Sequence, residues 1–318
     1  MKKMLLLIFC YVALTYSQRL TLNFTSYSAG VTIEGQDSWT SVMPTLSKAS
    51  ISNSTPLSYS SYGSGGKYLS VATHSSQLQL SKLFSSSITM ASTCTFYYSM
   101  VVNINSAGDG SYYSFSLDGE GYIFARVKMK DNNSGQWRIG IEKNTSSPVW
   151  GPTDFNYNQT YLIIVRYTKN PGTSPTYDDE SYVWVNPPLT GEPNIAAAEA
   201  SSGNGLQDYS SMSKCTGVVL NIHSGTPEWQ LDDIRVGYGT TNSAAFADMN
   251  YDNTMPVELA SFNAKALKND VILSWKTATE TNNFGFEIER ITITGHPEQP
   301  RATPLGGAEG RLDQDRLR

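Results

Sequence analysis

The sequence is poor in charged residues. Of its 318 residues, 16% are Asp, Glu, Lys or Arg, and the formal net charge is -5. Hydrophobic residues make up 39% of the chain, so a low net charge is combined with enough apolar material for a core. This excludes a solvated, disordered chain, and the lack of Ala/Glu/Lys/Leu enrichment excludes a coiled coil. The sequence has no run of Lys and Arg, which argues against a nucleic-acid partner.

Histidine is also scarce, at His74, His223 and His296. Three histidines so widely separated exclude the HxHxDH zinc site of metallo-lactonases, and the sequence contains no HExxH. It also lacks the GxSxG motif of a nucleophile elbow, so a serine triad has little support. His223 follows an apolar segment and is a weak candidate for a general base.

Long apolar runs are absent as well. Lys2 and Lys3 precede the short apolar run 4–14, which is too short to span a bilayer and is typical of a secretory signal peptide, residues 1–17. We therefore expect a secreted protein, extracellular or at the cell surface, with no membrane span. The mature chain then keeps Cys94 and Cys215, which an oxidising compartment would allow to pair or leave as two buried thiols.

The rest of the chain up to residue 240 is rich in strand patterns. The segments 122–130 and 136–143 alternate apolar and polar residues, as strands with one solvated face do. Other runs are apolar on both faces and predict inner strands, namely 97–104, 161–167, 182–185 and 218–222. A short helix is expected only around 195–200. The pattern predicts an all-β, antiparallel sandwich of jelly-roll size.

Four segments of this region carry a resemblance: ARVKMKDNN, TYLIIVRYT, SYVWVNPPLTGEP and EWQLDDIRVG. Residues 18–240 resemble the concanavalin A-like, laminin G-like jelly roll of bacterial exported proteins. The resemblance implies the fold more than an activity, because this fold carries lectins, carbohydrate-binding modules, glucanases and lyases.

A second pattern follows a linker over 241–255. PVELASFNA and ILSWKTATETNNFGFEIER, in residues 256–290, resemble the opening of the fibronectin type III domain in proteins of the type IX secretion class. The resemblance implies about seven strands, whereas the pattern supplies three, so we expect a truncated, incomplete segment. Residues 291–318 have a different composition and are predicted to be a disordered tail, whose native origin is left open.

Asp232 is the leading candidate for a metal ligand. In the predicted strand 229–236 it shares a side with Ile234 and Val236, and a carboxylate directed inward needs a partner. In related jelly rolls such a strand and the N-terminal strand hold a structural calcium ion, and Glu34 and Asp37 lie in the matching region. The resemblance therefore implies Ca²⁺ at these three residues. The alternative is a carboxylate bonded to turn amides.

The sequence offers few candidate catalytic residues. Asp118 and Glu120 are two positions apart and would share one face of a strand, at a spacing near that of glycosidase carboxylates. Gly119 and Gly121 favour a solvated hairpin tip instead. The acidic run 178–180 is interpreted as a solvated loop with a secondary capacity for a cation.

Exposed aromatic rings could form a platform for sugars. Trp150, in the loop 149–152, is the first candidate, followed by Tyr62 and Tyr68 in a Gly-rich loop. The tryptophans on predicted strands, Trp137, Trp184 and Trp229, are assigned to the core.

Two functions are compatible with these patterns. The first is a secreted, calcium-supported module, expected to be a monomer, that binds a glycan or cell-surface polymer. The second is a secreted Ca²⁺-dependent hydrolase of a glycoside, or of a small ester or lactone such as an N-acyl-homoserine lactone. In either case the ligand is a glycan or a small molecule rather than a nucleic acid.

Overall fold

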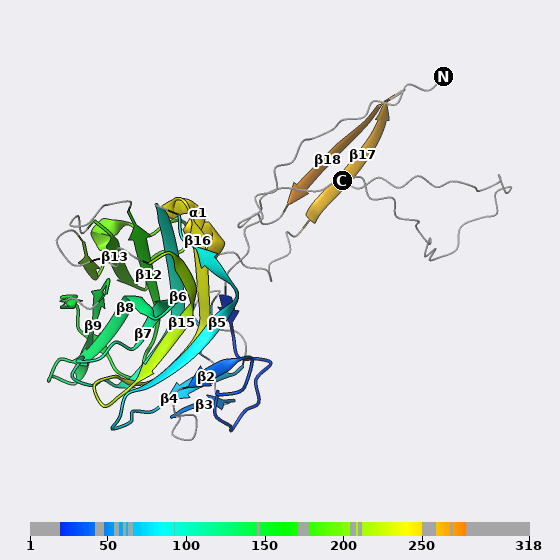
Figure 1. Cartoon of the computed structure of the whole chain (residues 1–318). Helices are drawn as coiled ribbons and strands as arrows, with labels where there is room; N and C mark the ends of the chain where they lie inside the picture. Colours follow the sequence, from blue (N-terminus) through cyan, green and yellow to red (C-terminus); the bar gives the residue numbers. More distant parts are fainter. Residues whose placement is uncertain are drawn as a thin grey trace. The chain divides into compact units, whose positions relative to one another are not determined.

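The computed structural model describes most of the region between residues 20 and 249 and one hairpin beyond it (Figure 1). The described residues are 20–41, 48–53, 57–59, 62, 66–91, 93–144, 147–170, 178–203, 208, 212–249, 259–267 and 270–277. The predicted signal peptide and the predicted tail lie outside them.

Two antiparallel sheets form the sandwich, as the strand patterns predict. Sheet A has the order β14-β13-β12-β6-β16-β4-β3, and β1 also pairs with β16. Its strands are β1 (Leu20–Leu22), β3 (Ala49–Ser52), β4 (Tyr68–Val71), β6 (Cys94–Ser106), β12 (Thr160–Lys169), β13 (Glu180–Val185), β14 (Ala200–Ser202) and β16 (Glu228–Gly239).

Sheet B has the order β10-β9-β8-β7-β15-β5-β2, and β11 also pairs with β9. Figure 1 shows β9, β8, β7, β15 and β5 side by side in this layer. Its strands are β2 (Trp39–Ser41), β5 (Leu78–Thr89), β7 (Phe115–Gly119), β8 (Tyr122–Asp131), β9 (Gln136–Glu142), β10 (Val149–Trp150), β11 (Phe155–Asn156) and β15 (Lys214–Ile222).

The main core lies between the two sheets. The predicted alternation is confirmed for β9 and for the second half of β8, because Val127, Met129, Ile139 and Ile141 are fully buried in this core. It is wrong for the first half of β8, where a bulge places the successive residues Phe124 and Ala125 both in the core and leaves Ile123 outside it. Trp137 and Trp229 are in it too. Cys94 and Cys215 are buried there as free thiols, and burial raises the pKa of Cys94 to about 11. We call the opposite surface of each sheet its outer face.

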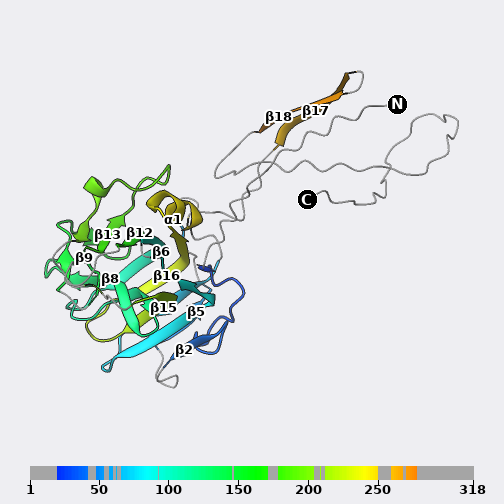
Figure 2. The same ribbon diagram turned by 45° about the horizontal axis from the view of Figure 1, so that its top comes forward.

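Helix α1 (Asn242–Met249) covers part of the outer face of sheet A, which Figure 2 shows from a second direction. A Cβ atom at Gly237 would lie 2.1 Å from the backbone nitrogen of Met249, so glycine is needed for this close approach. The boundary predicted at residue 240 is therefore wrong: the helix occupies part of the predicted linker and packs on the sandwich. The predicted helix near residue 195 is the short 3₁₀ turn Ile195–Ala197.

The hairpin beyond the sandwich is a separate unit. Strands β17 (Leu259–Leu267) and β18 (Asp270–Thr277) pair with Phe262 opposite Trp275, in agreement with the first two strands predicted for this segment. The third predicted strand, near residue 286, lies outside the described residues. In the described part of the chain, no helix has both the length and the apolar character needed to cross a membrane.

Candidate ligand-binding face

The outer face of sheet A is closed by a second apolar cluster. Phe246 and Met249 of α1 pack there against strand residues such as Tyr97 and Trp184. Tyr97 and Trp184 are stacked with ring centroids 6.4 Å apart, and the Trp184 indole donates a hydrogen bond to the Asn194 carbonyl at 2.8 Å. This face is therefore a second, smaller core.

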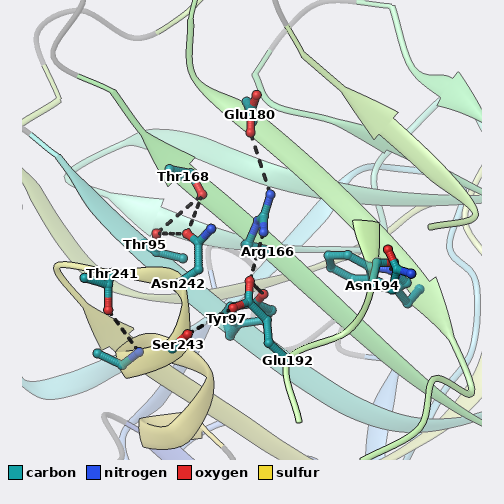
Figure 3. Close-up of polar contacts among 12 residues, drawn as sticks. Thr95, Tyr97, Arg166, Thr168, Glu180, Glu192, Asn194, Thr241, Asn242 and Ser243 are labelled. Carbon is teal, nitrogen blue, oxygen red and sulfur yellow. Dashed lines mark hydrogen bonds and ion pairs between the residues drawn. The ribbon is translucent and has the colours of Figure 1, made fainter. Parts of the chain in front are cut away.

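Polar contacts hold helix α1 and the loop that contains Glu192 on the outer face of sheet A (Figure 3). Glu192 accepts a hydrogen bond from the Tyr97 hydroxyl at 2.9 Å and forms an ion pair with Arg166 at 3.1 Å. Its other carboxylate oxygen accepts from Ser243 of α1 at 3.3 Å. Asn242, at the start of α1, accepts a hydrogen bond from Thr95 at 2.7 Å. Helix and loop are thus held to the strands by the same group of residues.

Tyr62 and Tyr68, two of the predicted sugar-stacking rings, belong to this closed side. Both are buried in the second cluster. The Arg235 guanidinium lies 3.8 Å from the centre of the Tyr62 ring. Because neither ring presents a face to solvent, the structure does not support them as a sugar platform.

Asp232 also lies on the outer face of sheet A rather than in the main core. It is paired with Val101 of the second cluster, and the register shifts between Asp232 and Arg235, where Asp233 has a φ of 45°. The prediction that it shares a side with Ile234 is therefore wrong, because this bulge turns it to the other face. Burial, together with the neighbouring Asp233 carboxylate, raises the pKa of Asp232 to about 8.

The three predicted calcium ligands do not form one cluster. Among the described residues, the acidic groups close enough to share an ion are Asp178, Asp179 and Asp208. Asp37 is exposed and is paired with Lys82 at 2.9 Å and with the Tyr27 hydroxyl at 2.7 Å. Desolvation raises the pKa of Asp37, but these two contacts outweigh it and lower the value overall. Glu34 has both carboxylate oxygens buried without a hydrogen bond from the described residues. The predicted set does not fit a calcium ion.

The acidic groups that do come together are Asp178, Asp179 and Asp208. The buried Lys143 lies among them, 2.6 Å from an Asp208 oxygen and donating a hydrogen bond to the Asp179 carbonyl at 2.8 Å. Desolvation, added to by Asp208, raises the pKa of Asp179. An all-oxygen set of this kind suits calcium chemically, although Lys143 already supplies one positive charge.

The predicted catalytic residues are also separated. Asp118 is on β7 and accepts a hydrogen bond from the Gly121 amide at 3.0 Å, whereas Glu120 lies in the turn, with a φ of 57°, and pairs with Lys214. Both residues therefore fit the alternative interpretation, that of a solvated hairpin tip. His223 follows the far end of β15, six residues along from the Asp118 partner Gly217, or about 20 Å at the rise of a strand. No catalytic group is assembled from these three.

His223 instead organises its own turn. Its Nδ1 accepts a hydrogen bond from the Gly225 amide at 3.3 Å, and its ring lies 3.7 Å from that of Tyr112, measured between centroids. Its backbone exchanges hydrogen bonds with the Thr226 hydroxyl. These contacts are those of a strand-end residue.

The outer face of sheet B is different, because a row of residues crosses it that begins with four polar side chains and ends with a glycine and a tryptophan. Cross-strand pairing and backbone hydrogen bonds connect one residue of each strand in turn. The row consists of Gln79 (β5), Asn221 (β15), Ser114 (just before β7), Lys128 (β8), Gly140 (β9) and Trp150 (β10). Five strand spacings of about 4.8 Å give it a length of about 24 Å.

Trp150 ends this row and is half-buried. A Cβ atom at Gly140 would lie 2.7 Å from the indole, so the ring rests on the backbone of β9. The Lys130 ammonium lies 4.2 Å from the ring centre, within the range of a cation–π interaction. Trp150 is thus held in place while part of it remains accessible, as the sequence predicted.

Basic side chains surround this end of the row. Arg126 and Lys128 share the buried Glu142, at 3.3 and 3.6 Å, and Arg138 forms an ion pair with Asp154. Desolvation raises the pKa of Glu142, although the two cations oppose the shift. Two carboxylates thus pair with three basic groups, and Lys130 is a fourth basic group beside them. The alternation of 122–130 placed three of them on one face, but Arg138 and Trp150 join them only through the pairing of β8, β9 and β10.

Comparisons with known proteins find distant structural likenesses alone. No family model matches the chain, and no curated protein matches it. The globular domain of T. cruzi calreticulin has a TM-score of 0.42 at 12% identity, over 70% of this chain and 88% of that one. Alginate lyase Aly36B has a TM-score of 0.43 at 11% identity, over 69% and 96%. Cellulose induced protein Cip1 has 0.39 at 14%, over 70% and 97%. Likenesses this distant carry no information about a ligand.

Proposed function

We propose that this chain binds an acidic glycan on the outer face of sheet B, around Trp150 and Lys130. One observation carries the proposal: the Lys130 ammonium stands 4.2 Å from the centre of a half-buried indole that is fixed on Gly140. The Lys130 ammonium lies over the ring and the backbone of β9 lies against it, so a sugar would stack on the indole after the flexible Lys130 side chain moves aside and pairs with a carboxylate of that sugar. The pair therefore suits a uronic acid better than a neutral hexose.

The surrounding charges support the same ligand class. The whole chain is acidic, at -5, yet four basic groups lie around this site, against the paired carboxylates of Glu142 and Asp154 and that of Glu199 beside Gly151. Lys130 has no carboxylate among its described contacts and remains half-exposed, so its charge is available to a ligand. A local excess of positive charge on an acidic protein attracts anions to one place. Secretion, which would bring the protein to extracellular glycans, belongs to this proposal.

The test compares polyuronates with their carboxyl-reduced, neutral derivatives, which keep the same linkages. We expect the full chain to retain the polyuronate in affinity electrophoresis and calorimetry, less strongly at high salt, and to release the neutral derivative. Trp150→Ala should lower the affinity about tenfold or more, as loss of a central aromatic contact does. Lys130→Gln should cost about threefold to tenfold and reduce the salt dependence.

Tyr122→Ala is the matched control. Tyr122 is an exposed aromatic residue on the same strand as Lys130, but it lies at the opposite end of the strand, next to the turn from β7. Melting temperatures of all variants separate a binding defect from unfolding. Equal binding of a polyuronate and its neutral derivative would remove the acidic ligand from the proposal. Unchanged binding by Trp150→Ala would remove the site.

A further inference from the structure

Three hydrogen-bond donors on the outer face of sheet A converge on one carboxylate. Glu192 accepts from the Tyr97 hydroxyl of β6 at 2.9 Å, from the Arg166 guanidinium of β12 at 3.1 Å and from the Ser243 hydroxyl of α1 at 3.3 Å (Figure 3). The three donors come from separate parts of the chain, and only the fold brings them together. A guanidinium and two hydroxyls around one carboxylate are the contacts that proteins use to bind a charged acid.

The donors are held in place by contacts other than this carboxylate. Tyr97 is 0% exposed, and its ring packs against those of Trp184 and Phe246, with centroids 6.4 and 5.3 Å away. Arg166 is directly opposite Tyr97 in the register of β12 and β6, and its guanidinium lies 4.5 Å from the centre of the Tyr182 ring. The arrangement of donors therefore persists when the carboxylate is removed.

The carboxylate belongs to a different kind of segment. Glu192 lies in the connection between β13 and β14, and its side chain is 27% exposed, compared with 5% for Arg166. The neighbouring Gly191 is exposed, and a Cβ atom there would meet nothing within 4 Å. The place that the carboxylate fills thus borders solvent, so an acid from solution can reach it once the Glu192 side chain is absent or turned away.

Arg166 also keeps donor capacity that Glu192 does not use. Its Nε has no hydrogen-bond partner among the described residues, and Glu180 is 3.7 Å from Nη2, which is too far for a hydrogen bond. A guanidinium that is 4% exposed is costly without a hydrogen-bonded carboxylate. The site therefore requires an anion and can donate more than one hydrogen bond to it.

We infer that Arg166, Tyr97 and Ser243 form a carboxylate-binding site that Glu192 fills as an internal ligand. The site accepts the carboxylate of a small organic acid or of a uronic acid, and Glu192 competes with that acid. A short tether gives an internal ligand an effective concentration of the order of millimolar, so in the natural chain Glu192 keeps the site closed to dilute acids. This inference does not rest on the proposed function, because the site is on the opposite sheet.

The experiment removes the internal ligand from the full chain and supplies acetate in its place. Glu192→Ala should lower the melting temperature by about 4–8 °C, because the buried guanidinium loses its hydrogen-bonded partner. Acetate at about ten times its Kd should recover about 3–5 °C of this loss, whereas chloride at the same ionic strength should not. If Glu192→Ala does not fold alone, refolding in acetate but not in chloride gives the same information.

Glu192→Gln is the matched control, because the amide fills the same space and blocks the site. Its melting temperature should respond equally to acetate and chloride, as should that of the unchanged protein. Tyr97→Phe in the Glu192→Ala background removes one donor and keeps the ring, so calorimetry should show about threefold to tenfold weaker acetate binding. Glucuronate and glucose extend the series: binding of glucuronate but not of glucose supports a uronic acid, and binding of acetate alone supports a small acid.

The inference is overturned if acetate stabilises Glu192→Ala no more than chloride does. It is also overturned if Glu192→Gln gains as much from acetate as Glu192→Ala, because the acid would then bind elsewhere. Unchanged acetate affinity after Tyr97→Phe would likewise exclude this group of donors. None of these results bears on polyuronate binding at Trp150, so the two proposals fail separately.

Discussion

The two outer faces of the sandwich are built from strands of similar length but are used in opposite ways. On sheet A, a helix and a loop cover the strands and bury aromatic rings between them. On sheet B, ion pairs and a row of polar side chains lie across the strands, and Trp150 remains partly accessible. One face extends the core, whereas the other is the face on which we propose that a ligand binds.

Two glycines account for much of this difference. Gly237 and Gly239 of β16 have helix backbone or side-chain atoms closer to them than any Cβ atom would allow. On sheet B, Gly140 leaves room for a single indole instead of a helix. A glycine on a sheet face thus leaves room for whatever packs there. Where a helix packs on it, the face stabilises the fold, and where a single indole packs on it, we propose that the face binds a ligand.

The largest expected effect concerns the closed face and pH. Desolvation raises the pKa of Asp232 to about 8, above the value of an unfolded Asp, which is about 4. The native state then holds the extra proton between these pH values, so the contribution of Asp232 to stability is fully present below about pH 4 and is lost as the pH rises through about 8. One pKa unit corresponds to about 1.4 kcal/mol, so the loss attributable to Asp232 is of the order of a few kcal/mol.

Asp232→Asn should remove this part of the pH dependence. Urea unfolding at pH 5, 7 and 9 measures it as the difference between the two proteins, since Asp179 and Glu142 also have raised pKa values and titrate in both. Parallel losses of stability in the two proteins would mean that Asp232 is not protonated in the fold.

The second prediction concerns the packing of helix α1 on sheet A. Gly237→Ala places a methyl group on the backbone of α1, so we expect a loss of about 1–3 kcal/mol, as overpacking causes. Gly191→Ala is the control, because nothing lies within 4 Å of a Cβ atom there. Thermal and urea unfolding measure the effect. Glycan binding should persist, and a loss of binding below the melting temperature would show that the two faces are coupled.

The smallest expected effect is that of calcium, which we propose for Asp178, Asp179 and Asp208 rather than for the ligands predicted from the sequence. Because Lys143 already neutralises part of this cluster, we expect weak binding, and calcium at about four times its Kd should raise stability by about 1 kcal/mol relative to chelator. Asp208→Asn should abolish the difference, and Asp37→Asn should not. Identical melting curves with calcium and EDTA in the unchanged protein would show that Lys143 alone balances these charges.

Much of the fold could be predicted because burial follows a two-residue period in strands. The segments 122–130 and 136–143 both form strands, and the predicted faces hold for 136–141 and 126–130, whereas a bulge at Phe124 and Ala125 breaks the alternation before them. The placement of Asp232 could not be predicted, since a bulge at Asp233 reverses the side and leaves no mark in the pattern. Helix α1 was missed because it is short and follows a stretch that resembles a linker.

The sequence predicted only part of the candidate site. Trp150 stood out as an aromatic residue in a loop, and the basic residues of β8 stood out by alternation. The contact of Trp150 with Gly140 and the group of donors at Arg166 did not, because each depends on the pairing of separate strands. Only the register between these strands brings the residues together.

The central position of β6 has a consequence for how the protein reaches its fold. β6 pairs with β12 on one side and with β16 on the other, and the partners of Val102 are Tyr161 and Leu231. The second contact joins residues 129 positions apart, so the middle of sheet A cannot form until almost the whole sandwich sequence is available. Such non-local pairing slows folding, and the half-made sheet exposes β6 as an unpaired apolar edge during that time.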